Sequence, residues 1–170
     1  TSASDTSVSG AILVGLLAAT NAGMAVPDES VKKAIKYYVG MTSTTGEVAY
    51  SGTGGHGSSD ARSSIACLVF ALAKRKDLSE FEATLDYLRD RIQSSGNNSY
   101  PEYTRYYQAQ ALFQGDLEAW EKWNKLLISQ LASLQQPDGS IQGSYGPEVG
   151  TSMSLLSLAL NFRLLPIYER

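Results

Sequence analysis

The chain has 170 residues, of which 43% are hydrophobic and 18% charged, and its formal net charge is −3. This length suits a single domain, and the hydrophobic content excludes a disordered chain. The slightly acidic balance disfavours nucleic acid and anionic lipid as partners, because both are bound through basic patches.

Four segments are apolar on nearly every side, which predicts four buried helices. The first, residues 8–22, contains the longest apolar run, yet that run is too short to span a bilayer. The others cover residues 63–73, 106–113 and 153–162. Cys67, the single cysteine, lies in the second segment, so we expect a buried thiol and no internal disulfide.

Three amphipathic segments alternate with the buried ones. In residues 31–39, 81–92 and 120–134, apolar side chains recur every three or four positions, which is typical of helices that bury one face. The order is therefore buried helix then surface helix, three times, with one last buried helix. This predicts an all-α fold, a stack of helical hairpins with about seven main helices, whose repeat spacing of about 40 to 55 residues is typical of helical-pair repeats.

Local signals mark the ends of these helices. Either Asp5 or Ser7 can cap the first helix, and Asp60 and Ser79 are placed to cap later helices. Gly23 follows the end of the first helix, and Pro101 opens another. Long connections, residues 42–60, 93–102 and 135–150, each join a surface helix to the next buried one. They should therefore meet at one end of the stack, where we expect a binding site.

The third connection follows a leucine-rich helix and reads QQPDGSI at residues 135–141. It resembles the Gln-Trp repeat of squalene–hopene cyclases and their relatives, in which leucines lead to Gln-x-x-x-Gly-x-Trp. Gln135 and Gly139 match this pattern, and Ile141 stands where the family has tryptophan. We expect Asp138 to bond backbone locally, Gly139 to supply a positive φ, and Gln135 to satisfy open helix carbonyls. Residues 46–48 are a more divergent version of the turn.

The resemblance implies an α/α-toroid, like that of terpene cyclases and prenyltransferases. Such rings close with about six hairpins, whereas this chain supplies three and a half as a single domain over residues 1–170. Three explanations stay open: the chain belongs to a larger protein, it pairs with a copy of itself or another partner, or residues 164–170 cover the gap. The sequence does not indicate a compartment.

The catalytic motifs of the toroid families are missing from this sequence. Neither Asp-x-Asp-Asp, Asp-Asp-x-x-Asp nor the Cys-Gly-Glu-Gln thioester occurs. A prenyltransferase-type zinc site would need Asp two residues before Cys67, where Ile65 stands, and His56 is the single histidine. We therefore predict no metal, no cofactor and no catalytic residue, which favours binding over catalysis.

The stretch YPEYTRYYQAQ, residues 100–110, places many hydroxyls and amides on a helix expected to face inward. It is interpreted either as a hydrogen-bonded network that fixes the core or as a groove that binds a ligand through tyrosine faces and Arg105. His56 is either a solvated loop residue or an acid–base group. The candidate ligand-binding residues are Tyr50, His56, Asp60, Tyr103, Arg105, Tyr106 and Tyr145.

The leading hypothesis is a cyclase-like repeat domain that binds a small apolar or glycan ligand, or a protein, without cyclase activity. A homodimer, or contact with the rest of a longer chain, is the expected protein partnership. The alternative is an enzyme that acts on a polyisoprenoid or polysaccharide in the toroid cleft. An apolar cavity would favour the isoprenoid, and Asp60 facing Glu102 across a polar groove would favour the polysaccharide.

Overall fold

The computed structural model describes residues 5–52, 55–93 and 100–163. These residues form seven α-helices and no β-sheet, so the predicted all-α fold is confirmed. The helices are α1 (Thr6–Asn21), α2 (Asp28–Met41), α3 (Asp60–Leu72), α4 (Ser79–Arg89), α5 (Pro101–Gly115), α6 (Leu117–Leu134) and α7 (Pro147–Ala159).

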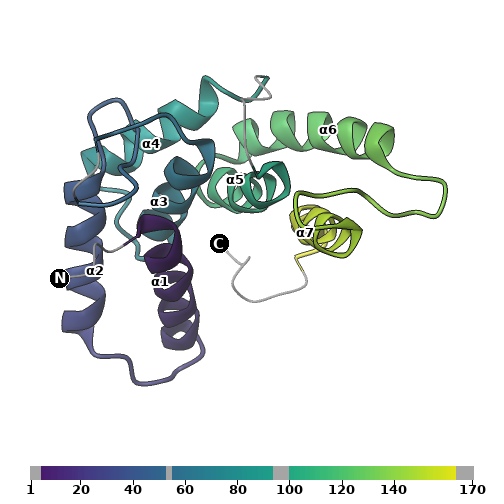
Figure 1. Cartoon of the computed structure of the whole chain (residues 1–170). Helices are drawn as coiled ribbons and strands as arrows, with labels where there is room; N and C mark the ends of the chain where they lie inside the picture. Colours follow the sequence, from purple (N-terminus) through teal and green to yellow (C-terminus); the bar gives the residue numbers. More distant parts are fainter. Residues whose placement is uncertain (1–4, 53–54, 94–99, 164–170) are drawn as a thin grey trace.

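The helices form a curved stack with an inner and an outer layer (Figure 1). Helices α1, α3, α5 and α7 follow one another along the inner side, and α2, α4 and α6 cover the outer side. Helix α3 packs against α1, α4 and α5, and α5 packs against α3, α6 and α7. The alternation of inner and outer helices along the chain follows the order predicted from hydrophobic patterning.

The centre of the stack holds the most deeply buried helix. Every side chain of residues 63–71 in α3 is buried, as a helix with apolar and small residues on all sides requires. The outer helices bury one face, and in α6 that face carries Trp120, Trp123 and Leu127. Leu134, the last member of the stripe predicted there, is exposed because it lies at the end of its helix.

Helices α1 and α7 are not buried on every side, so that part of the prediction was wrong. Val8 and Ile12 of α1 are exposed, and so are Leu155 and Leu156 of α7. The two helices lie at opposite ends of the arc, and each therefore has an inner neighbour on one side only (Figure 1). The proposed cover for this gap, residues 164–170, lies outside the described residues.

Two turns after outer helices have the same geometry. An isolated antiparallel bridge joins Thr42 to Val48 in the first turn and Gln135 to Ile141 in the third. Both turns place a glycine with positive φ two residues before the second bridge partner, and both close with the same pattern of backbone hydrogen bonds. In the first turn, the Ser43 N–H donates to the Glu47 carbonyl, and the Ser43 carbonyl accepts from the Gly46 N–H. Gln136 makes the same two bonds in the third turn, with Ser140 and Gly139. The fold thus contains an internal structural repeat.

The turn after α6 has the predicted contacts, except that Gln136 rather than Gln135 bonds to an open carbonyl of the helix. Asp138 accepts from the Ser140 N–H at 3.0 Å, and Gly139 has a φ of +87°, as expected. The Gln135 amide, however, donates to the Gly139 carbonyl, which belongs to the turn. Its neighbour Gln136 donates to the Leu134 carbonyl, which α6 leaves open.

Two of the three predicted helix caps differ by one residue from the caps that the structure shows. Asp5 caps α1 as expected, by accepting from the Ser7 N–H. The cap of α3 is Ser59 rather than Asp60, and α4 is preceded by Leu78 without a side-chain cap, so that Ser79 is already helical. Asp60 instead lies in the first turn of α3, where its negative charge faces the positive end of the helix dipole.

Candidate functional site

The beginnings of the inner helices and the connections that precede them meet at one end of the stack. Thr6, the first residue of α1, donates its N–H to the Tyr50 carbonyl and its hydroxyl to the Ala49 carbonyl. Glu102, in the first turn of α5, accepts from the N–H of Ser144 in the connection before α7. These contacts join α1 to the connection that leads into α3, and α5 to the connection that leads into α7.

Three exposed tyrosines gather at this end, and we name Tyr50, Tyr100 and Tyr145 the tyrosine rim. They are 53%, 48% and 66% exposed. The rings of Tyr100 and Tyr145 stack with their centroids 5.7 Å apart and their planes within 4° of parallel. Tyr50 lies close enough to Tyr100 for the two to interact electrostatically. The rim therefore presents aromatic faces to solvent.

The Tyr50 hydroxyl is fixed by Asp5, the cap of α1. It donates to Asp5 Oδ2 at 2.7 Å. This hydrogen bond raises the pKa of Tyr50 above its ordinary value of 10.0. Burial opposes ionisation of Asp5, but the hydrogen bonds from Tyr50 and Ser7 outweigh it and lower the pKa of that carboxyl. The hydrogen bond between Tyr50 and Asp5 thus links the tyrosine rim to the start of α1.

The other two rim tyrosines occupy similar local sequences. Tyr100 precedes Pro101 at the start of α5, and Tyr145 precedes Gly146 and Pro147 at the start of α7. Proline is well suited to the first helical turn because it lacks the N–H that would have no partner there. Both rings therefore lie at the start of an inner helix.

Beneath the stacked pair lie two buried charges. The Glu102 carboxylate is almost fully buried and accepts from the Ser144 N–H at 2.8 Å and the Ser144 hydroxyl at 3.3 Å. Arg105, one turn later, is 8% exposed, and its Nε has no hydrogen-bond partner. Burial lowers the pKa of Arg105, and the charge of Glu102 offsets part of that effect. The two opposite charges thus lie about one helical turn apart in α5.

The remaining tyrosines of α5 lie deeper, in an interior aromatic cluster. The ring centroid of Tyr107 is 4.8 Å from that of Tyr103 and 4.9 Å from that of Tyr106. Tyr38 of α2 interacts electrostatically with this cluster and donates to the backbone carbonyl of Thr6. Burial raises the pKa of Tyr38 and of Tyr107 well above the usual range. This arrangement is typical of a structural core.

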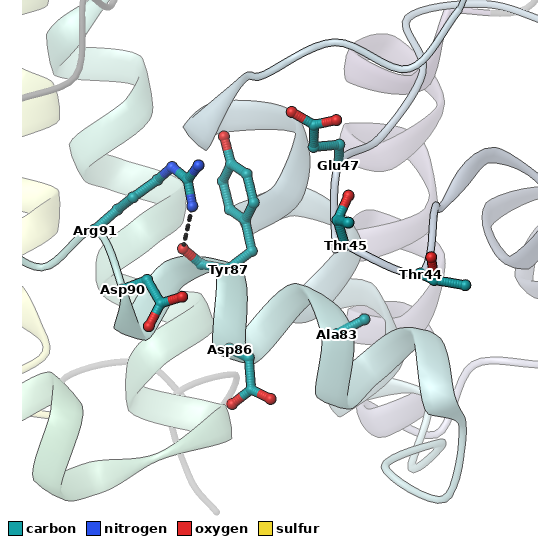
Figure 2. Close-up of a pocket in the computed structure, with 8 residues that line it drawn as sticks. All are labelled: Thr44, Thr45, Glu47, Ala83, Asp86, Tyr87, Asp90 and Arg91. Atoms are coloured by element: carbon teal, nitrogen blue, oxygen red, sulfur yellow. Dashed lines mark hydrogen bonds between the residues drawn. The ribbon is translucent and has the colours of Figure 1, made fainter.

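Asp60 belongs to a separate cluster, beside a groove that lies between the turn after α2 and helix α4. It is buried, accepts from the Tyr87 hydroxyl at 3.2 Å and lies 3.8 Å from Arg91 Nε. Arg91 covers the face of the Tyr87 ring and donates to the Tyr87 carbonyl, as Figure 2 shows. The groove, of about 480 Å³, is lined by Thr44, Thr45, Glu47, Ala83, Asp86, Tyr87, Asp90 and Arg91.

A second groove, of about 720 Å³, runs over the outer surface between the end of α4 and the start of α6. Arg89 spans its edge, with ion pairs to Glu82 and Asp86 on α4 and to Asp116 at the start of α6. Charged side chains line both grooves, and the second groove also contains the apolar side chains of Ile92, Ala119 and Leu126.

The described part of the chain contains no group of three or more His, Cys, Asp and Glu side chains arranged to hold a metal ion. Burial raises the pKa of the Cys67 thiol to about 12, so this thiol is unreactive at neutral pH. No helix within these residues has both the length and the apolar character needed to cross a bilayer.

The seven candidate residues do not line one cleft. Tyr50 and Tyr145 are exposed at the rim, and His56 is exposed on the connection before α3. Tyr103 and Tyr106 are half-buried in the interior cluster, whereas Asp60 and Arg105 are buried in separate polar settings. The prediction missed Tyr100, although the Tyr-Pro-Glu sequence at the start of α5 and the Tyr-Gly-Pro-Glu sequence at the start of α7 were a signal for it.

Comparison of the chain with protein-family models, with curated proteins and with solved structures found no match in any of the three. The geometry of the rim and its surroundings therefore carries the functional proposal.

Proposed function

We propose that the chain is a binding module of the α/α-toroid type that contacts its ligand at the tyrosine rim. The observation that carries the binding role is the gathering of Tyr50, Tyr100 and Tyr145, all exposed, at the end where three connections meet. Exposed aromatic side chains on connections that rigid helices position are a common basis for recognition.

The toroid part of the proposal is supported by two features of the fold. Inner and outer helices alternate along a curved stack, and the turns at Thr42–Val48 and Gln135–Ile141 repeat the same bridge and glycine geometry. The second of these turns is the one that resembles the Gln-Trp repeat. A repeated turn between an outer and an inner helix is the local unit from which such a ring is built.

The alternative, a polysaccharide-cleaving enzyme, needs two carboxyl groups that face a common substrate. Asp60 and Glu102 were the candidates for this pair. Asp60 is buried against Tyr87 and Arg91, and Glu102 is buried against Ser144. A general acid or base must reach the proton that it transfers, so these two carboxylates favour a structural role and the module is proposed as non-catalytic.

The test is amide NMR of the labelled protein during titration with four fragments: glucose, N-acetylglucosamine, geraniol and geranyl diphosphate. We expect at least one fragment to shift the amides of Tyr50, Ser144 and Tyr145. Shifts confined to the groove of Figure 2, or to the exposed flanks of α1 and α7, would overturn the proposal, as would the absence of shifts with all four fragments.

A further inference from the structure

We infer that the ligand of the tyrosine rim is a neutral oligosaccharide that stacks on the ring faces of Tyr100 and Tyr145. This inference rests on the proposed function, because it assumes that the rim is the binding site.

The stacked pair leaves one face of each ring open to solvent, on opposite sides of the pair. The two rings are within 4° of parallel, and each keeps about half or more of its surface exposed although one face lies against its partner. An apolar chain gains affinity from a concave pocket that removes it from water on most sides. A sugar ring, in contrast, has one face of C–H groups that can lie on a single tyrosine, while its hydroxyls remain in water or bond to polar neighbours.

The charges at this end favour a neutral ligand over a phosphorylated one. Each inner helix carries an acidic residue at its cap or in its first turn: Asp5, Asp60, Glu102 and Glu148. A helix start attracts phosphate through its partial positive charge, and a carboxylate placed there cancels that attraction. The rim therefore disfavours nucleotides and isoprenoid diphosphates, both of which also stack or pack on aromatic side chains.

The carboxylates that repel phosphate are suitable acceptors for sugar hydroxyls. Asp5 already accepts from the Tyr50 hydroxyl at the rim, and Glu148 is exposed just after Tyr145 in the chain. Tyrosine hydroxyls can both donate and accept, which matches the alternating donors and acceptors of a saccharide.

The rim is also fixed before any ligand arrives. Glu102 holds Ser144, and through it Tyr145, at the start of α5, and Pro101 restricts the backbone next to Tyr100. Asp5 holds the Tyr50 hydroxyl. A binding surface whose side chains are already ordered loses less conformational entropy on association, which favours a weakly interacting ligand such as a sugar.

The experiment is isothermal titration calorimetry of the chain with cellohexaose, chitohexaose and xylohexaose, whose β-linked rings present extended flat faces. We expect binding to at least one of them, weakened about tenfold in Tyr145→Ala and in Tyr100→Ala because each loses one stacking face. Phe162→Ala is the matched control. It removes a comparably exposed aromatic ring, 72% exposed against 66% for Tyr145, that lies just past the C-terminal end of α7 and roughly 20 Å from the start of that helix.

The possible results separate this inference from the proposed function. If geraniol or geranyl diphosphate shifts the rim amides while no hexasaccharide binds, the saccharide inference fails and the rim remains a binding site. Hexasaccharide binding that survives both tyrosine substitutions, or that Phe162→Ala weakens equally, also overturns the inference. Circular dichroism of each variant establishes that the helices are retained.

Discussion

Gly46 and Gly139 occupy the same position in two turns from different hairpins, with φ values of +77° and +87°. Their surroundings differ. A Cβ at Gly46 would lie 2.2 Å from the Ala83 carbonyl oxygen, whereas the nearest atom at Gly139 would be Gln135 Nε2, at 3.9 Å. The repeated turn thus lies against backbone in one hairpin and against open space in the other.

This difference predicts that a change to alanine lowers the free energy of unfolding more at Gly46 than at Gly139. Gly139→Ala adds only the strain of a positive φ, and we expect a loss of about 1 kcal/mol in the free energy of unfolding. Gly46→Ala adds a collision with backbone that cannot move aside, so a loss of about 2–4 kcal/mol is expected. Urea unfolding measures both. Equal losses would show that the turn after α2 does not pack against α4 as described.

Glu102 is predicted to support both the stability of the fold and the position of the rim. Glu102→Ala leaves Arg105 without its compensating charge and Ser144 without its acceptor, and the expected loss is about 2–4 kcal/mol. Glu102→Gln keeps an oxygen for Ser144, so faster hydrogen exchange of the Ser144 amide is expected in the alanine variant alone. Equal exchange in both variants would contradict this assignment.

Much of the fold could be predicted from the sequence because helix periodicity depends on local spacing. The inner and outer order, the buried α3 and the turn at Gly139 all follow from such local patterns. Burial around a helix also depends on how many neighbours it has, which spacing does not encode. The apolar sides of α1 and α7 were therefore expected to be buried, although both helices lie at the ends of the arc.

The candidate site was harder to predict because it combines residues from separate connections. Tyr145 was identified, but its stacking partner Tyr100 lies in another connection and was counted only as part of a tyrosine-rich stretch. Asp60 and Arg105 were chosen for their charge, and both are buried in contacts within the fold. Residue type alone does not distinguish a charge that faces a ligand from one that faces a partner in the core.

Asp116 is predicted to make stability depend on pH in acid. The hydrogen bond from the Ala119 N–H, followed by that from Arg89, lowers the pKa of this carboxyl from its ordinary value of 3.8. A lowered carboxyl pKa stabilises the folded state above the unfolded pKa, and this contribution is lost as the pH falls through the folded pKa. Asp116→Asn keeps a cap for α6 but loses the charge.

The stability difference between the native chain and Asp116→Asn should therefore be constant above about pH 5 and disappear in stronger acid. Asp116→Ala also removes the cap and should cost about 1 kcal/mol more than the asparagine variant at neutral pH. Thermal unfolding followed at several pH values measures both effects. A difference that grows on acidification would contradict the assigned direction of the pKa shift.

Two adjacent residues of α1 test whether the outer side of this helix is exposed to solvent at the end of the arc. Ile12 is 60% exposed and Leu13 is 1% exposed. Ile12→Asp should change the free energy of unfolding by less than about 1 kcal/mol, because its side chain already faces water. Leu13→Asp buries an unpaired carboxylate in the core and should prevent stable folding. Chemical denaturation of the two variants, each at several protein concentrations, distinguishes the cases. If Ile12→Asp were as destabilising as Leu13→Asp at high protein concentration, and less so at high dilution, α1 would be covered in solution by another copy of the chain and the open flank would be an interface.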